Sequence, residues 1–274
     1  MRRLLPVLAL LAAGCGGPLN FTDPDEPRYA GRPLVDPPPA ADSLTVVSFN
    51  LRFGIEVDGM IRLFESHHVL KNADVLLLQE MDVPSTRKVA HALGMHYVYY
   101  PATINPQSQR PFGNAILARW PITDTRKLRL PHLGRMGKTQ RIAVSGTIRP
   151  GGHALRLYSF HMATGMESTG QWKKDQARAI VHDADSTGAG MDVILGGDLN
   201  SERVARAFEG SGYRWVTQAL PSTAGWLSLD HIFLKGIELT RPTARGVVTD
   251  NQGTSDHNPL WIVVRLDDRR AGGD

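Results

Sequence analysis

The stretch that decides the fold is Val193-Ile194-Leu195-Gly196-Gly197-Asp198-Leu199-Asn200-Ser201, in which an apolar run stops abruptly at polar side chains. A short run of β-branched and aliphatic residues predicts a buried strand. A carboxylate at the end of such a strand is costly to bury unless it meets a partner or a metal. The stretch therefore predicts a strand that carries Asp198 and Asn200 into a polar site.

The same arrangement recurs along the chain. Glu80 follows the apolar run Val75-Leu76-Leu77-Leu78, and Asp230 precedes Ile232-Phe233-Leu234. Any single polar group of this kind could be a solvated strand end or a helix cap. The recurrence instead indicates one shared site. The polar residues at these strand ends are Asn50, Glu80, His161, Asp198, Asn200, Asp230, Asp256 and His257.

The pattern of the remaining segments favours two packed sheets. Strands are predicted at 44–50, 73–80, 96–101, 112–118, 141–148, 154–161, 192–197, 230–234, 245–249 and 259–265. Helical spacing is seen over 58–72, 84–93 and 169–184, the last with Trp172 facing inward and Lys173 outward. Because residues 96–161 are almost entirely β, an α/β sandwich fits better than an alternating barrel.

Seven motifs in this chain resemble those of the endonuclease/exonuclease/phosphatase family, the superfamily of deoxyribonuclease I, abasic endonucleases and bacterial sphingomyelinases. They occur in family order and span about residues 44–266. The resemblance implies a DNase I-like α/β sandwich of two packed mixed β-sheets flanked by helices. The motifs are Ser48-Phe49-Asn50, Leu78-Gln79-Glu80-Met81-Asp82, Gly113-Asn114-Ala115-Ile116-Leu117, Ser159-Phe160-His161-Met162, Gly196-Gly197-Asp198-Leu199-Asn200-Ser201, Leu229-Asp230-His231-Ile232-Phe233 and Ser255-Asp256-His257-Asn258-Pro259-Leu260.

The resemblance implies a hard divalent cation, Mg²⁺ or alternatively Mn²⁺ or Ca²⁺, because such ions take oxygen ligands. Glu80 is its expected anchor, with Asn50 beside it. Asp256 either adds a second carboxylate or orients the neighbouring His257.

Catalytic roles also follow from the resemblance. Asp198 would align the attacking water or act as general base, and Asn200 would help to hold that water. Asp230 would pair with His257 and stabilise its protonated form, while His161 would donate to a phosphoryl oxygen. Whether Asp198 or the Asp230–His257 pair is the base stays open at this point.

A stretch rich in basic residues runs from Arg126 to Arg141 and contains no acidic residue. It is interpreted either as a phosphate-contacting surface or as a solvated face, since no aromatic side chains are interleaved for base stacking. Arg141 and Asn114 are candidate contacts to substrate phosphate. The basic residues are Arg126, Lys127, Arg129, Arg135, Lys138 and Arg141.

The N-terminal region predicts export. Residues 1–14 have the charged start, apolar run and small residues of a signal peptide, and Ala12-Ala13-Gly14-Cys15 resembles the lipobox of bacterial lipoproteins. An ordinary signal peptide with an incidental cysteine is the alternative. Cys15 is the only cysteine of the chain, which excludes an internal disulfide framework and a Cys-based zinc site.

Domain boundaries follow from composition. Residues 15–42 are rich in proline and are predicted to be a semi-rigid tether, residues 43–266 a single domain, and residues 267–274 a polar tail. The 274 residues, 42% of them hydrophobic, can form a sizeable core. The formal charge of +4 permits an anionic partner without naming one.

These observations predict an exported, metal-dependent hydrolase of phosphate esters, monomeric and anchored to a bacterial membrane through lipidated Cys15. It would face the periplasm or the cell surface, and Gly16 after the cysteine favours the outer membrane. The substrate is open between nucleic acid and a phospholipid or small phosphodiester, as in phospholipase C or sphingomyelinase. A non-catalytic surface-binding module is the alternative from a different class.

Overall fold

The computed structural model describes residues 19–34, 36–39, 41–104, 109–135 and 137–266. The first sheet contains β1 (Tyr29–Gly31), β2 (Ser43–Asn50), β3 (Val75–Met81), β4 (His96–Ile104), β5 (Pro111–Ala118), β12 (Glu238–Leu239), β13 (Arg245–Val247) and β14 (Leu260–Arg265). The second sheet contains β6 (Thr123–Arg129), β7 (Ile142–Ile148), β8 (Leu155–His161), β9 (Asp192–Asp198), β10 (Arg214–Trp215) and β11 (Asp230–Lys235). The predicted signal peptide, Cys15 and the polar tail lie outside the described residues.

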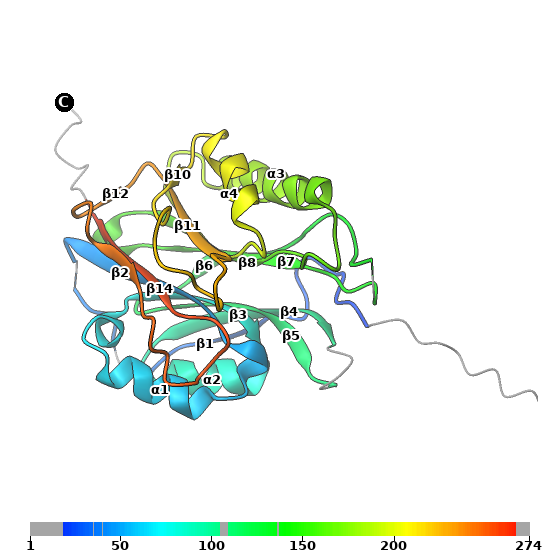
Figure 1. Ribbon diagram of the computed structural model, residues 1–274. Helices are drawn as coiled ribbons and strands as arrows, with labels where there is room; N and C mark the ends of the chain where they lie inside the picture. Colours follow the sequence, from blue (N-terminus) through cyan, green and yellow to red (C-terminus); the bar gives the residue numbers. More distant parts are fainter. Residues whose placement is uncertain (1–18, 35, 40, 105–108, 136, 267–274) are drawn as a thin grey trace, which may run out of the picture.

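The two sheets pack face to face, and helices cover their outer faces (Figure 1). The first sheet has the order β1-β4-β5-β3-β2-β14-β12, with β13 also paired to β14, and the second has the order β10-β11-β9-β8-β7-β6. Both are mixed, because β2–β3 and β8–β9 are parallel and the other pairs are antiparallel. The predicted DNase I-like sandwich is confirmed.

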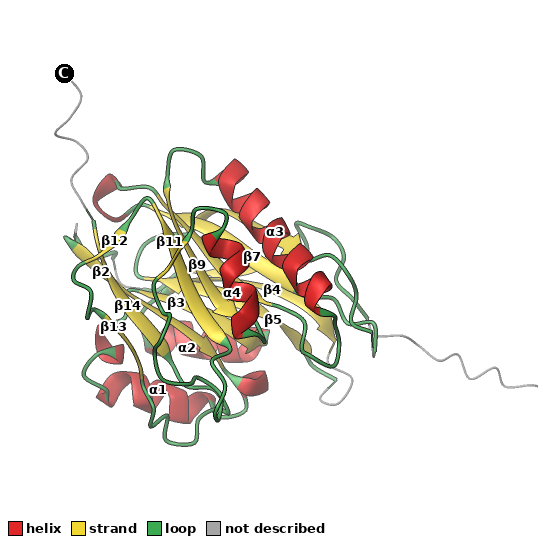
Figure 2. Ribbon diagram, turned by 45° about the horizontal axis from the view of Figure 1, so that its top comes forward, coloured by secondary structure: helices red, strands yellow, loops and turns green. Residues whose placement is uncertain are grey.

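Helices α1 (Val57–Ser66) and α2 (Val83–Ala92) lie on the first sheet, and α3 (Gly170–Thr187) and α4 (Glu202–Glu209) on the second (Figure 2). Short 3-10 helices are η1 (Arg52–Gly54), η2 (Leu70–Asn72) and η3 (Pro150–Gly152). The side chain of Asp82 accepts from the backbone N–H of Ser85, and Thr169 does the same for Trp172, so both α2 and α3 begin with a side-chain cap. Among the described residues, no helix is long and apolar enough to cross a membrane.

Apolar side chains fill three layers of the sandwich. Leu77, Ile116 and Ile194 belong to the layer between the sheets. Phe64 of α1 belongs to the layer between the first sheet and its helices, and Phe208 of α4 to the layer between the second sheet and its helices. Central strands such as β3 and β9 are thus buried on both faces, which explains why their sequences contain continuous apolar runs.

Strand β6 and helix α4 were not predicted. The sequence of β6, Thr-Asp-Thr-Arg-Lys-Leu-Arg, lacks an apolar face because the strand lies at an edge of its sheet and is largely solvated. Edge strands commonly carry charged residues, which weakens their sequence signal. The eight residues of α4 are too few for a clear helical period.

Part of the predicted tether packs against the domain. Tyr29 of β1 pairs with Tyr99 of β4, Asn20 forms an isolated bridge with Thr103, and the amine of Lys127 donates to the backbone oxygen of Glu26 at 2.8 Å. A proline-rich sequence favours extended backbone, and extended backbone is also what an added edge strand requires. The prediction that residues 15–42 form a semi-rigid, unpacked tether is therefore wrong for residues 19–31.

Candidate active site

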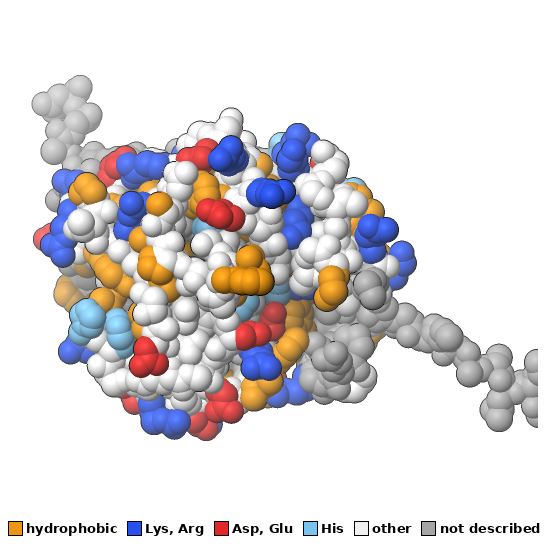
Figure 3. All heavy atoms as spheres, viewed as in Figure 1, with side chains coloured by type: hydrophobic (Ala, Val, Ile, Leu, Met, Phe, Trp, Pro, Cys, Tyr) orange, Lys and Arg blue, Asp and Glu red, His pale blue; other side chains and the backbone are white. Residues whose placement is uncertain are grey.

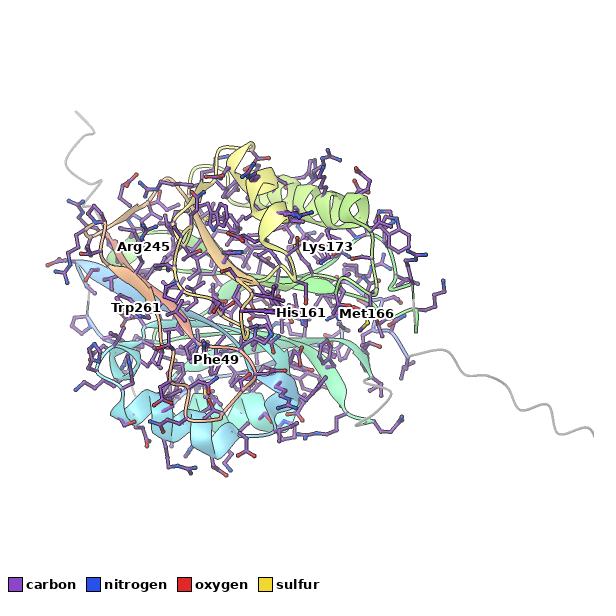
Figure 4. The ribbon with its side chains drawn as sticks, viewed as in Figure 1. Phe49, His161, Met166, Lys173, Arg245 and Trp261 are labelled. Carbon is purple, nitrogen blue, oxygen red and sulfur yellow. The ribbon has the colours of Figure 1, made fainter. Side chains whose placement is uncertain are left out.

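Strand register brings the polar strand ends together. Asn50 at the end of β2 is paired with Gln79 of parallel β3, which places Glu80 beside it. His161 at the end of β8 is opposite Asp198 of parallel β9, and Asp230 at the start of antiparallel β11 is also opposite Asp198. The site therefore lies at one end of the sandwich, where both sheets contribute. Figure 4 shows His161 near the boundary between them.

Asp198 is the centre of the site. Its Oδ2 accepts from Asn50 Nδ2 at 3.1 Å and lies 3.5 Å from His161 Nε2 and 3.9 Å from His257 Nε2. Its Oδ1 accepts from the backbone N–H of Asn200 at 2.7 Å. Burial, with a further contribution from the nearby Asp230 carboxylate, raises the pKa of Asp198 to about 7. Asp198 is thus poised to exchange a proton near neutral pH.

His257 is held by a buried carboxylate. Its Nδ1 lies 2.7 Å from Asp230 Oδ2, which confirms the predicted contact. Burial alone would lower the pKa of His257, but the charge of Asp230 and its hydrogen bond raise the pKa to about 10. His257 is therefore an imidazolium at pH 7, with Nε2 directed to the side on which Asp198 lies.

Glu80 lies on an irregular part of its strand. The register between β3 and β5 shifts between Leu78 and Met81, and Glu80 itself has φ 58°. A bulge of this kind redirects a side chain at the end of a strand. Glu80 Oε1 then accepts from Asn50 Nδ2 at 3.2 Å and lies 4.0 Å from His161 Nε2.

The residues predicted to hold a cation suit that role. Burial raises the pKa of Glu80, and the hydrogen bond from Asn50 only partly offsets this effect. A bound cation would supply the missing positive charge, and carboxylate and amide oxygens are the ligands that Mg²⁺ takes. Asp256 contributes to the charge near Glu80 and is exposed, with Arg52 Nε 3.8 Å from its Oδ2. The exposed Asp256 carboxylate could thus bind a cation from its solvent side.

A second group of ligand-type atoms exists among the described residues. Atoms of Asp198, Asp230 and His257 lie within 4.8 Å of one another. Nδ1 of His257 is hydrogen-bonded to Asp230, and the pKa of His257 is raised, so this histidine carries a proton at the nitrogen a metal would need. The three residues therefore act as a proton-bearing cluster and not as a closed metal site. Glu80 with Asn50 is the better place for a cation.

His161 is controlled by a buried arginine. Arg141 Nη1 lies 2.9 Å from Nε2 and 3.1 Å from Nδ1 of His161, while Nη2 donates to Glu167 Oε2 at 2.6 Å. Burial and the charge of Arg141 hold the pKa of His161 well below its ordinary value. His161 is therefore neutral at pH 7, so one ring nitrogen accepts from Arg141 and the other is left to donate.

Two of the predicted phosphate contacts are engaged elsewhere in this structure. Arg141 is buried and interacts with His161 and Glu167, so its first role is to orient the histidine. Asn114 donates both amide hydrogens to backbone oxygens, those of Ile142 at 3.0 Å and Ser159 at 3.2 Å. It joins β5 to the second sheet and has no hydrogen left for a phosphate.

Lys173 was assigned to the solvent face of its helix, and this assignment is wrong. Only 5% of Lys173 is exposed, and its Nζ donates to the backbone oxygen of Asn200 at 2.6 Å. Lys173, Ala177, Ile180 and Ala184 have the i, i+4, i+7, i+11 spacing of one buried helix face. Recognising that spacing would have identified Lys173 from the sequence.

Asn200, the backbone acceptor of Lys173, adopts a left-handed conformation with φ 51°. Its side-chain Nδ2 donates to the backbone oxygen of Met162 at 3.0 Å. Three hydrogen bonds, to Asp198, Met162 and Lys173, thus hold this residue in a conformation that only a few non-glycine residues adopt. Asn200 lies where it was predicted, directly beside the Asp198 carboxylate.

An exposed tryptophan lies on a hairpin that is tied to the catalytic residues. Ala224 and Leu227 exchange backbone hydrogen bonds of 2.9 and 2.8 Å, and Trp226 at the turn is 87% exposed. Before the turn, Thr223 Oγ1 accepts from the backbone N–H of Asp230 at 3.1 Å. Apolar side chains protrude near the place where histidine and acidic side chains meet in Figure 3. Trp226 was not predicted from the sequence, because a single exposed tryptophan in a loop has no pattern that marks it.

The site combines a proton-exchanging carboxylate, an imidazolium, a neutral histidine and a carboxylate suited to a cation, all on a DNase I-like sandwich. This combination defines the class of phosphoester hydrolases. A model of the Endonuclease/Exonuclease/phosphatase family matches residues 47–257, so the chain belongs to that family. No curated protein sequence matches the chain.

Solved structures share the fold at low identity. A mannosyl-6-phosphatase of Bacteroides thetaiotaomicron is 20% identical with a TM-score of 0.66, over 81% of this chain and 100% of that one. Human Nocturnin's catalytic domain, bound to sulfate, is 19% identical with a TM-score of 0.63, over 88% and 98%. A humanized TDP2 of D. rerio is 18% identical with a TM-score of 0.64, over 82% and 100%.

Proposed function

We propose that this chain hydrolyses phosphate esters by in-line attack of water, with the help of a divalent cation held by Glu80, Asn50 and Asp256. The observation that carries the proposal is the position of Asp198, whose carboxylate lies between a neutral histidine and an imidazolium. The cation, when bound, would polarise a phosphoryl oxygen and offset the charge that develops on it. All other steps fall to side chains of this chain.

The charge states favour one general base. His257 already carries a proton at pH 7, because its pKa is raised to about 10, and so it cannot accept another. Asp198, with a pKa of about 7, can accept the proton of the attacking water. The imidazolium of His257 would then stabilise negative charge on the phosphoryl group, and neutral His161 would donate to a second oxygen.

Lipid phosphodiesters are a second candidate substrate class beside nucleic acids. The exposed Trp226 on the hairpin attached to Asp230 favours a substrate with an apolar or aromatic part next to its phosphate. A non-catalytic binding module fits less well, because Glu80, Asp198 and His257 are all present and lie together. Asn50 donates to both Glu80 and Asp198, and His257 Nε2 lies 3.9 Å from Asp198 Oδ2.

We further propose that the chain is exported and anchored through lipidated Cys15, on the basis of the signal-like residues 1–14 and the lipobox. Replacing Cys15 by Ser should release the protein from membranes that are washed with high salt, which screens any attraction between basic side chains and headgroups. Unchanged membrane association would contradict the anchor without affecting the assignment of the active site.

A turnover screen tests the hydrolase proposal. Mature protein, residues 15–274, should be assayed with Mg²⁺, Mn²⁺ or Ca²⁺ on plasmid DNA, RNA, sphingomyelin, phosphatidylcholine and a chromogenic bis-phosphodiester. Starting instead at Ser43 would remove β1 from the edge of the first sheet. Metal-dependent turnover that Asp198→Ala abolishes supports the proposal, and no turnover of any phosphoester favours a binding module.

A further inference from the structure

The first described residues are fixed to one end of the domain. Asn20 Nδ2 donates to the backbone oxygen of Lys138 at 2.9 Å, and Asn20 Oδ1 accepts from the backbone N–H of Gln140 at 2.9 Å. On the other side, the backbone oxygen of Leu19 accepts from the N–H of Ile104 at 2.9 Å. In Figure 1 this dark blue segment lies at the right-hand end of the sandwich. The chain therefore leaves the domain at a defined point.

That point is close to the proposed lipid anchor. Four residues lie between Cys15 and Asn20. An extended chain rises at most about 3.6 Å per residue, so the five steps from Cys15 to Asn20 span at most ~18 Å. A lipid on Cys15 would hold this end of the domain beside the bilayer, whereas a free spacer as far as residue 42 would let it move away. This step rests on the anchor proposed above and not on the hydrolytic activity.

The surface at this end carries unpaired positive charge. Arg129, Arg135 and Lys138 are exposed, and among the described residues no carboxylate lies within 4.0 Å of their charged groups. The other basic residues of this stretch are engaged, since Arg126 pairs with Asp183, Lys127 donates to Glu26 and Arg141 pairs with Glu167. Lys and Arg side chains gather at the right-hand edge of the face shown in Figure 3.

Exposed apolar side chains accompany these cations. Leu19 is 63% exposed, Leu133 is 42% exposed and Met166 is 79% exposed. Met166 belongs to the loop before α3, which joins the basic loop where Arg135 N–H donates to the backbone oxygen of Glu167 at 2.8 Å. Figure 4 shows Met166 between His161 and this end of the molecule. The basic loop around Arg135 and the loop that carries Met166 thus lie side by side.

We propose that Leu19, Arg129, Leu133, Arg135, Lys138 and Met166 form a membrane-docking surface for anionic phospholipid headgroups. Cations near an anionic bilayer are attracted to its headgroups, and neighbouring aliphatic side chains can enter the interface. A nucleic acid fits less well. A stacked ring pair, His132 on Trp172, lies beside Leu133, but its imidazole is 2.9 Å from the Asp175 carboxylate, which would repel a nucleic-acid phosphate. The surface continues to the active site through Glu167, which binds Arg141 beside His161.

Vesicle binding of the mature chain without a lipid on Cys15 tests the surface separately from the anchor. We expect binding to vesicles of phosphatidylcholine with phosphatidylglycerol, weakened by salt, and little binding to phosphatidylcholine alone. The triple variant Arg129→Glu/Arg135→Glu/Lys138→Glu should lose at least ~50-fold in vesicle partitioning, since each cation contributes about fivefold. A control, Arg62→Glu/Lys71→Glu/Arg241→Glu, changes the net charge equally at exposed sites outside this surface.

The control triple variant should lose no more than a few-fold, and both variants should keep wild-type turnover of a small chromogenic phosphodiester. Equal losses in the two variants, or no binding of the wild type to anionic vesicles, would overturn the docking surface. A triple variant that keeps vesicle binding but loses binding of a single-stranded oligonucleotide would assign the surface to nucleic acid and also overturn it. Absence of turnover would contradict the hydrolase and leave vesicle binding as an independent result.

Discussion

His257 and His161 lie on two sides of Asp198 in opposite electrostatic surroundings. His257 contacts the Asp230 carboxylate and is an imidazolium, whereas His161 contacts the Arg141 guanidinium and is neutral. Both side chains are buried, so burial alone lowers the pKa of each, and the charge of the neighbouring residue decides the outcome. One residue type therefore supplies a cation and a neutral donor to the same reaction.

The largest effects should come from the groups that meet at Asp198. Asp198→Ala, His257→Ala and Glu80→Ala should each lower turnover by at least ~100-fold, as expected for loss of a base, a charge-stabilising group or a metal anchor. Steady-state kinetics on the purified variants, with circular dichroism to show that they fold, measures this. A folded variant with near wild-type turnover would remove that residue from the mechanism.

Removing the charge beside His257 should change the pH profile. In the wild type, activity should rise as Asp198 loses its proton near pH 7 and should persist until His257 loses its proton near pH 10. Asp230→Asn removes the charge that raises the pKa of His257, so the upper limb should move down by several pH units, with ~30-fold lower activity at pH 8. If the upper limb stays in place, His257 is not the group that titrates there.

The same pair also affects stability with a predictable sign. The folded-state pKa of His257 is raised from 6.5 to about 10, so the stabilisation is fully present below pH 6.5 and is lost as the pH rises through 10. The melting temperature of Asp230→Asn should therefore differ most from that of the wild type below pH 6.5. Thermal unfolding between pH 6 and pH 10 measures the difference.

The neutral state of His161 depends in part on the charge of Arg141. Arg141→Gln should raise the pKa of His161, because the charge that lowers it is removed, and turnover should fall by ~10-fold as the histidine loses its orientation. NMR titration of the His161 ring would follow the pKa directly. Glu167→Gln, which leaves the arginine in place, should have a smaller effect on the histidine.

Lys173 makes no hydrogen bond with either histidine and acts through Asn200, whose backbone oxygen accepts from its Nζ. Lys173→Met should lower kcat by about fivefold, because the hydrogen bond that holds the backbone oxygen of Asn200 is lost. Lys173→Arg should restore part of the rate, since it keeps a charged donor. A loss of stability with unchanged kcat would show that Lys173 has only a structural role.

The smallest effect is expected at Trp226, which belongs to the hairpin attached to Asp230 but exchanges no proton itself. Trp226→Ala should raise KM about fivefold for a substrate with an apolar or aromatic part and leave kcat nearly unchanged. Comparing a large phosphodiester with a small one measures this. Equal effects on both substrates would place Trp226 outside substrate binding.

The sequence predicted the sandwich and the strand-end residues because each apolar run stops at a polar group, a pattern that strand register then turns into proximity. Glu80, Asp198 and His257 were found in this way. The neighbouring residues that set the charge states of the site were not fully predicted. Glu167 lies in a loop with no periodic pattern, and the role of Arg141 depends on that loop packing beside β7.

The N-terminal segment shows the same contrast between local pattern and packing. Seven prolines predicted a spacer, but pairing of β1 with β4 depends on residues about 70 positions later in the chain. Nothing in the sequence of residues 29–31 indicates that β4 is their partner strand. Propensity correctly indicated extended backbone, and only the fold specifies what that backbone lies against.

The pairing of β1 with β4 also links the folding of the domain to its position. During synthesis Tyr29 emerges well before Tyr99, so the N-terminal segment can dock only after β4 has been made. Under the proposed anchor at Cys15, docking of β1 would shorten the free chain between the lipid and the folded domain. The native domain would then be held nearer to its point of attachment than the unfolded chain, which stays attached by a longer free segment.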